Sequence, residues 1–196
     1  MNRLISLLVL IFLFSTAEAQ LFKPREKRPV RKEHMAGAVS MENKRVVFRD
    51  TIATSGYNIA QTRERVLKWY NKRYNIPTVI SSKIITDNAR CFEAIAEEYI
   101  TFKNKFFVLD RSRIYYYLTF NFDEKSCEVI ISRISYWYDD ESPDGGIRYN
   151  AEEIITDEHS IKNGRLKKEP GKFRTKTIDL KNELFKEIKQ EITSKP

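Results

Sequence analysis

The sequence predicts an α+β fold, a two-layer sandwich in which an antiparallel four-stranded sheet has two helices on one face. Three observations support this prediction. Four runs are rich in alternating β-branched and aromatic residues, two further segments have apolar residues at helical spacing, and the order is strand, helix, three strands, helix. Short turns between the last three strand segments favour an antiparallel meander.

The first nineteen residues, 1–19, have the three parts of a secretory signal peptide. Arg3 lies in a short basic segment, residues 4–14 are apolar except for Ser6, and Ala17-Glu18-Ala19 supplies a small-residue cleavage site. The apolar run is shorter than the ~20 residues needed to span a bilayer, and no cysteine stands at the cleavage site for lipid attachment. The sequence therefore predicts an exported protein, periplasmic or extracellular, without a lipid anchor.

Residues 20–43 are charged, contain proline and lack hydrophobic periodicity, so they are predicted to form a basic, mobile leader. The chain has a net charge of +8, and eight basic against three acidic residues place +5 of it within residues 20–45. Such a leader could contact an anionic membrane surface, and a solvated linker is the alternative. The nearly neutral remainder, together with export, argues against nucleic-acid binding.

A single α+β domain is expected over residues 44–196. Its first strand is predicted over residues 45–52, where β-branched residues are frequent. The first helix is predicted to begin after Asn58, because a glutamine three residues later completes the spacing of a capping box. Ile76-Pro77 ends this helix.

Three strands are expected over residues 89–102, 113–122 and 127–138. The middle strand alternates well, with one face for the core and one polar or tyrosine-rich face. The predicted core face is Ile114, Tyr116, Leu118, Phe120 and Phe122, and the opposite face is Tyr115, Tyr117, Thr119 and Asn121.

Residues 139–178 are predicted to be an irregular charged excursion, acidic in its first half and basic in its second. Its acidic part has oxygen-bearing side chains at calcium-loop spacing, beginning at Asp140, but Ala151 stands where a bidentate glutamate is required. A final helix is predicted near residues 179–192, with Asp179 as its N-cap.

The chain resembles an uncharacterised secreted family of Bacteroidetes, a domain of unknown function with a TATA-box-binding-protein-like fold. The resemblance runs from about Lys44 to Tyr138 and extends to parts of the tail. It rests on Val46-Val47-Phe48, Leu67-Lys68-Trp69-Tyr70, the small residues Ala94 and Ala96, the meander segments 116–122 and 129–138, and the tail segments 151–155, 172–174 and 177–185. It implies the fold and an envelope location, and it supplies no catalytic residues.

The meander bears on the two cysteines, Cys91 and Cys127. They fall on the second and fourth strands, which flank the third, so they would lie about 10 Å apart for strands ~4.8 Å apart. A disulfide needs Cα atoms within ~7 Å. Two unpaired, buried thiols are therefore predicted, although an oxidising compartment would permit a disulfide.

No catalytic, cofactor-binding or metal-ligating residue is predicted. His34 lies in the predicted leader, and His159 is interpreted as a surface residue. Cys91 and Cys127 lie in apolar strand segments where cysteine behaves as a small hydrophobe. Phosphate-loop, nucleophile-elbow and CxxC motifs are absent from the sequence.

Aromatic side chains provide the candidate binding site. With both helices on one side of the sheet, the other side would be open, and amphipathic rings there could bind a protein or a glycan. The candidate residues are Tyr115, Tyr117, Tyr136, Trp137 and Tyr138. The alternative is that residues 139–178 fold across this face.

The sequence thus favours a non-enzymatic cell-envelope module that binds a partner through this face or through the leader. One alternative is a hydrolase that combines the acidic loop, His159 and sheet tyrosines. Nucleic-acid binding, prompted by the resembled fold and the basic charge, is a further and disfavoured alternative. Nothing in the sequence predicts the oligomeric state.

Overall fold

The structure, a computed structural model, describes residues 31–54, 56–105 and 108–194. The predicted signal peptide and residues 20–30 of the predicted leader lie outside these described residues. Among the helices that are described, none is long and apolar enough to cross a membrane.

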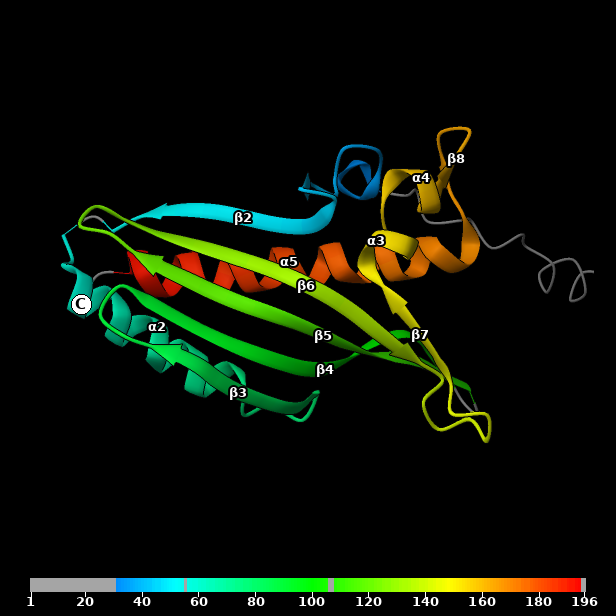
Figure 1. Cartoon of the computed structure of the whole chain (residues 1–196), viewed down its shortest axis with the longest axis horizontal. Coiled ribbons are helices and arrows are strands. Elements are labelled where there is room, and N and C mark those ends of the chain that lie inside the picture. Colours follow the sequence, from blue (N-terminus) through cyan, green and yellow to red (C-terminus); the bar gives the residue numbers. More distant parts are fainter. Residues whose placement is uncertain (1–30, 55, 106–107, 195–196) are drawn as a thin grey trace, which may run out of the picture. The chain divides into compact units, whose positions relative to one another are not determined.

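One antiparallel sheet forms the centre of the domain (Figure 1). Its strands lie in the order β1-β2-β6-β5-β4-β3, and β7 also pairs with β6. β2 pairs with residues 126–132 of β6, and β7 pairs with residues 135–138 of the same strand. The strands are β1 (Met41–Glu42), β2 (Arg45–Ala53), β3 (Val79–Asp87), β4 (Cys91–Lys105), β5 (Val108–Phe122), β6 (Ser126–Tyr138) and β7 (Ile147–Asn150).

The predicted α+β class and the meander are confirmed, but the prediction of four strands is wrong, because the sheet has seven strands within the described residues. The longest strand missed, β3, is an edge strand that pairs only with β4. Most of its side chains are exposed. Its sequence therefore lacks the apolar alternation that reveals a half-buried strand. β1 and β7 are too short to give such a pattern.

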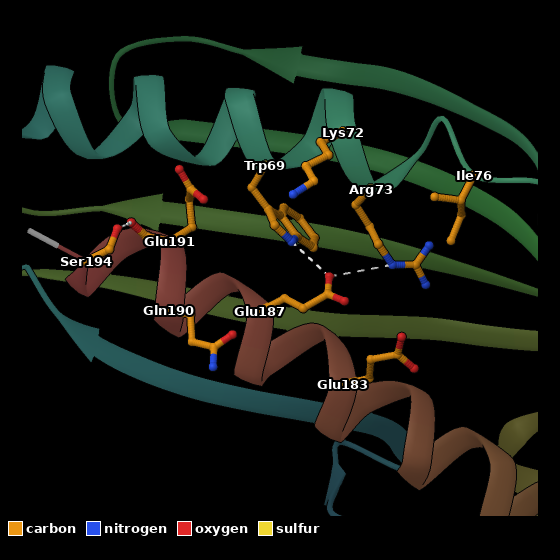
Figure 2. A pocket seen from close by; sticks show the side chains of 9 residues that line it. All are labelled: Trp69, Lys72, Arg73, Ile76, Glu183, Glu187, Gln190, Glu191 and Ser194. Carbon is orange, nitrogen blue, oxygen red and sulfur yellow. Dashed lines mark hydrogen bonds and ion pairs between the residues drawn. The ribbon is translucent and has the colours of Figure 1, made fainter. Parts of the chain in front are cut away.

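Two long helices, α2 (Ile59–Arg73) and α5 (Lys168–Thr193), lie on one face of the sheet (Figure 2). The predicted capping box of α2 is present, with the Asn58 side chain accepting a hydrogen bond from the Gln61 backbone N–H at 2.9 Å. The smaller elements are η1 (Lys32–His34), α3 (Ala151–Ile154), α4 (Asp157–Ser160), β8 (Ile161–Lys162) and β9 (Arg165–Leu166).

α5 begins eleven residues before the predicted cap at Asp179, since its first residue is Lys168. Pro170 and Gly171, which favour a loop in the sequence, lie in the first turn of α5, where proline is tolerated. A Cβ atom at Gly171 would lie 3.0 Å from the Leu166 Cβ atom, so glycine allows this close approach. The predicted irregular excursion over 139–178 therefore contains regular structure through most of its length.

Residues 31–43 also differ from the predicted mobile leader. Arg174, a fully buried residue of α5, donates hydrogen bonds to the backbone oxygens of His34 at 2.7 Å and Met35 at 2.6 Å. The His34 side chain is buried and its Nε2 atom lies 2.8 Å from the Asp179 carboxylate. Because a buried guanidinium needs hydrogen-bond acceptors, these contacts fix the segment against α5.

Alternation along the strands divides the sheet into two faces. The covered face, which packs against α2 and α5, carries the predicted core residues of β5 and their neighbours, all with little or no exposure. Cys127 lies on the covered face and is buried, whereas Cys91 has the opposite orientation and is half-buried; both thiols are free. The paired residues Cys91 with Asn121 and Phe122 with Cys127 place the two cysteines on opposite sides of β5, as the meander predicted.

Candidate functional site

Three of the five aromatic residues predicted as a binding site lie on the face opposite to the helices, here called the open face. Tyr115 and Tyr117 of β5 and Trp137 of β6 are each half-buried. Trp137 pairs with Arg113 and Tyr115 pairs with Ser135 across β5 and β6. Side chains of directly paired residues in antiparallel strands point to the same face. The three rings therefore share one surface.

Tyr136 and Tyr138 point the other way. Tyr136 is 1% exposed, and its hydroxyl is hydrogen-bonded to the Thr177 hydroxyl at 2.7 Å. The Tyr138 ring packs against Phe173 of α5, and its hydroxyl accepts a hydrogen bond from the Lys172 ammonium at 3.0 Å. Three consecutive strand residues cannot all face one partner. The prediction that Tyr136 and Tyr138 belong to the binding site is therefore wrong, and both residues pack against α5 instead.

Arginine side chains lie over the rings of the open face. The distances from guanidinium carbon to ring centroid are 3.9 Å for Arg111 on Tyr99, 4.7 Å for Arg133 on Tyr117, and 4.0 Å and 4.9 Å for Arg148 and Arg113 on Trp137. Cation–π contacts of this kind contribute about 0.5–1 kcal/mol each at exposed sites. They hold flexible arginine side chains in defined positions on the surface.

Carboxylates fix two of these arginines further. Arg113 donates to Glu97 at 3.1 Å and to Asp140 at 2.5 Å, and Arg111 donates to Glu141 at 2.5 Å. Desolvation lowers the pKa of Arg113, but the hydrogen bonds that Arg113 donates to Glu97 and Asp140 outweigh it, and the pKa is raised overall. Arg113 is therefore a permanent cation on the open face, at the end that residues 139–146 meet.

Residues 139–146 meet one end of the open face. The Trp137 indole N–H donates to the Gly145 carbonyl oxygen at 2.8 Å. Gly146 has a φ of +69°, and a Cβ atom there would lie 2.5 Å from the carbonyl oxygens of Tyr138 and Asp139, so this turn requires glycine. Among the described residues of the 139–178 excursion, this loop and Arg148 of β7 lie against the open face, at its Trp137 end. The residues that follow β7 include the short helices α3 and α4, which contact α5.

A bulge in β6 shapes the middle of the open face. The register between β5 and β6 shifts between Tyr115 and Tyr117, and Arg133 adopts a positive φ of 51° at this point. This conformation is unfavourable for a residue with a side chain and is often found at functional positions. Pairing of β6 with β2 stops at Ser132, and pairing with β7 starts at Ser135.

A hollow of about 490 Å³ lies at this interruption. Arg45 and Arg133 line it together with Ser135, Asn150 and Glu152. The Glu152 carboxylate accepts a hydrogen bond from the Val46 backbone N–H at 2.8 Å. The Glu152 carboxylate is thus bonded to the start of β2, while both arginines are exposed. The hollow therefore offers cationic and hydroxyl groups beside Tyr117.

Sequence reasoning missed Tyr99 and the four arginines that lie on the rings. Tyr99 stands an even number of residues from Glu93 and Glu97 and an odd number from the buried Phe92. Alternation along the strand could therefore have predicted that Tyr99 faces away from the core. The arginine contacts depend on the register between strands. Arg148 additionally lies on β7, which the sequence did not predict.

The residues that the hydrolase hypothesis combines have separate partners in the structure. His159 is exposed, and its Nδ1 atom is hydrogen-bonded to the Thr156 hydroxyl at 2.9 Å. Asp140, the first residue of the calcium-loop pattern, is paired with Arg113. Among the described residues, Glu33, His34 and Asp179 have possible metal-ligand atoms within 4.8 Å of one another. The His34–Asp179 hydrogen bond accounts for this cluster without an ion.

The fold defines the class, an α+β domain in which the helices cover one face of an antiparallel sheet. Residues 48–137 match the family described as "Domain of unknown function (DUF4468) with TBP-like fold", which confirms the resemblance drawn from the sequence. No curated protein matches the chain.

Two crystal structures are similar to the whole domain. One is a DUF4468 family protein from Bacteroides ovatus, with 26% sequence identity, a TM-score of 0.77, and coverage of 86% of this chain and 98% of that one. The other is a TBP-like protein from Parabacteroides distasonis, with 17% identity, a TM-score of 0.66, and coverage of 81% and 99%. The second supports the fold alone.

Proposed function

We propose that the protein is an exported, non-enzymatic module of the cell envelope that binds a protein partner through the open face. The observation that supports this most directly is the set of arginines held over Tyr99, Tyr117 and Trp137. Arginine, tyrosine and tryptophan are the residues most enriched among those that dominate the binding energy of protein interfaces. The face supplies them in fixed positions, which lowers the entropy lost on association.

The same geometry favours a protein over a glycan. A sugar ring stacks on a free aromatic face, but guanidinium groups already lie 4.0 Å and 4.9 Å from the Trp137 ring centroid. Arg133 and Arg148 are held by ring contacts, and in the described part of the chain no carboxylate pairs with either. An acidic segment of a partner would supply the missing charge, and carboxylates bind guanidinium groups with two hydrogen bonds.

Affinity capture tests this proposal. The chain from residue 20 onward is used as bait in an envelope extract of the source organism, in three forms: wild type, Tyr115→Ala/Tyr117→Ala, and Lys186→Ala/Lys189→Ala. The last pair lies exposed on α5 and serves as the matched control. We expect a protein retained by the wild type and the control but lost with the tyrosine variant, after circular dichroism shows all three folded.

Equal retention by the tyrosine variant would place any partner elsewhere and contradict the proposal. A captured partner is then titrated against Arg133→Gln and Arg148→Gln. We expect about tenfold weaker binding for each, because a charge-assisted hydrogen bond contributes on the order of 1.5–3 kcal/mol. Retention of polysaccharide in place of protein would favour the glycan reading.

A further inference from the structure

The groove between α2 and α5 has features that the open-face proposal does not use (Figure 2). It has a volume of about 440 Å³, within the range typical of small-molecule sites, roughly 300–1,000 Å³. Trp69, Arg73 and Ile76 line it from α2 and the residues after it, and Glu183 and Glu187 line it from α5. Glu187 lies between the helices in Figure 2, and it accepts a hydrogen bond from the Trp69 indole N–H at 3.1 Å.

Arg73 is the unusual member of this groove. The residue is only 6% exposed, and its Nη2 atom donates to Glu98 at 2.9 Å. Both oxygens of the buried Glu98 are used, because the Tyr116 hydroxyl donates to the other one at 2.6 Å. The Nε and Nη1 atoms of Arg73 have no hydrogen-bond partner, and Nε is 3.8 Å from Glu187, too far for a hydrogen bond.

Buried donors without acceptors are rare in folded proteins, since their loss of water is uncompensated. A core that needed only packing would place an apolar side chain at this position. Arg73, which lines the groove, therefore holds buried N–H groups that an oxygen acceptor of a ligand would satisfy once the neighbouring Glu187 side chain moves aside.

The wall formed by α5 has the opposite chemistry. Glu183, Glu187 and Glu191 recur every four residues and therefore form one stripe along the helix. These carboxylates, with Glu98 beneath them, outnumber the cations Lys72 and Arg73 in the groove and Lys68, which lies 3.9 Å from Glu191. A simple anion would be repelled by this wall, and a simple cation would leave the donors of Arg73 unsatisfied.

We infer that the α2–α5 groove binds a zwitterionic amino acid with an apolar side chain. Its carboxylate accepts hydrogen bonds from Arg73, its ammonium group contacts Glu183 and Glu187, and its side chain packs against Trp69 and Ile76. This site is on the helix side of the molecule and is independent of the open face. Binding requires the Glu187 side chain to exchange its contact near Arg73 for one with the ligand ammonium group.

Calorimetric titration of the folded chain from residue 20 onward tests the inference, with L-leucine as the probe. Two analogues separate the charged groups: L-leucinamide lacks the carboxylate, and 4-methylpentanoate lacks the ammonium group. We expect leucine to bind at millimolar concentration or below, and each analogue to bind at least about tenfold more weakly. No heat and no rise in melting temperature with millimolar leucine would overturn the inference.

Variants then locate the site. Glu187→Gln keeps an oxygen that can accept the Trp69 hydrogen bond but removes the charge, so it should weaken leucine about tenfold and leave 4-methylpentanoate nearly unchanged. Glu183→Gln, which is exposed, gives the same test should Glu187→Gln fail to fold. Glu124→Gln, in the turn between β5 and β6, is the matched control and should bind as the wild type does. Equal leucine binding by all variants would place the ligand outside this groove.

Discussion

The two faces of the central sheet are made from the same strands and differ in what their side chains contact. On the covered face, the Tyr116 hydroxyl lies 2.8 Å from the Tyr74 hydroxyl and donates to Glu98, and Tyr136 is hydrogen-bonded to Thr177. On the open face, Tyr117 lies beneath the guanidinium group of Arg133. The same residue type thus satisfies buried polar groups on one side and positions surface charges on the other.

The difference between the contacts on the two faces shows that aromatic content alone does not identify a binding surface. A ring on the covered face is surrounded by α2 and α5 and has no surface to offer a partner. Tyr117, on the open face, is half-buried and has the guanidinium group of Arg133 over its ring. The parity of a residue along its strand decides which role it has.

The two cysteines give the largest expected contrast between the faces. Burial, and to a smaller extent the nearby Glu128, raises the pKa of Cys127 to about 12. Cys91, on the open face, is only half-buried, and its pKa is raised by this partial burial and by Glu93. At pH 8 the thiolate fraction of Cys127 falls on the order of a thousandfold below that of an unfolded cysteine. We expect iodoacetamide to label Cys91 in the folded protein and Cys127 only after unfolding, as measured by peptide mass spectrometry. Equal labelling rates would contradict the assignment of the faces.

A pair of aromatic substitutions on β5 sharpens the same comparison. Phe120 has no exposed surface and packs against Trp69 and Phe92, so Phe120→Ala should lower the free energy of unfolding by about 3–5 kcal/mol. Tyr117→Ala removes a half-buried ring and one cation–π contact, and should cost less than about 1 kcal/mol. Urea unfolding followed by tryptophan fluorescence measures both values. Similar costs for the two variants would mean that the open face is also part of the core.

The dependence of stability on alkaline pH is the smallest of the three expected effects. Burial is the main cause that raises the pKa values of Tyr74, Tyr116 and Tyr136 above 10, their ordinary value. Below pH 9 both the folded and the unfolded forms keep these protons, so their contribution to stability is fully present. Above pH 10 only the unfolded form loses them, and stability falls.

The expected loss between pH 9 and pH 10.5 is about 2 kcal/mol for the three tyrosines together. Urea unfolding at each pH measures it, and absorbance at 295 nm reports the ionisation of tyrosine in the folded protein. Tyr136→Phe removes one of the three groups and should reduce the slope of stability against pH. A stability that is constant up to pH 10.5 would contradict the burial of these hydroxyl groups.

Much of the fold could be predicted because local patterns determined it. Strict alternation marked Ile114 to Phe122 as a strand with a core face, and the spacing of Asn58 and Gln61 marked the start of α2. Edge strand β3 and the first turns of α5 could not be predicted in this way. β3 is exposed on most of its length, and Pro170-Gly171 resemble a loop unless the adjacent chain is seen to pack against them.

The candidate site shows the same division. Tyr115 and Tyr117 were predicted from alternation and from the expected open side of the sheet. Tyr136, Trp137 and Tyr138 were included together as the aromatic end of the next strand. Trp137 lies on the open face, whereas Tyr136 and Tyr138 face α5. The arginines were missed because each reaches its ring from a different strand or a different position along the sheet. No periodicity within one segment reports such a contact.

By itself, the sequence determined the α+β class, the family resemblance, the parity of the central strands and the separation of the two cysteines. Those features depend on spacing within one segment or on the number of strands between two residues. The tertiary structure decided the seven-stranded sheet, the placement of arginines over the open-face rings, and the location of Arg73 in the lining of the α2–α5 groove. These features depend on strand register and helix packing, which bring together side chains far apart in the chain, and the free energy of such contacts is determined only when both partners are in place.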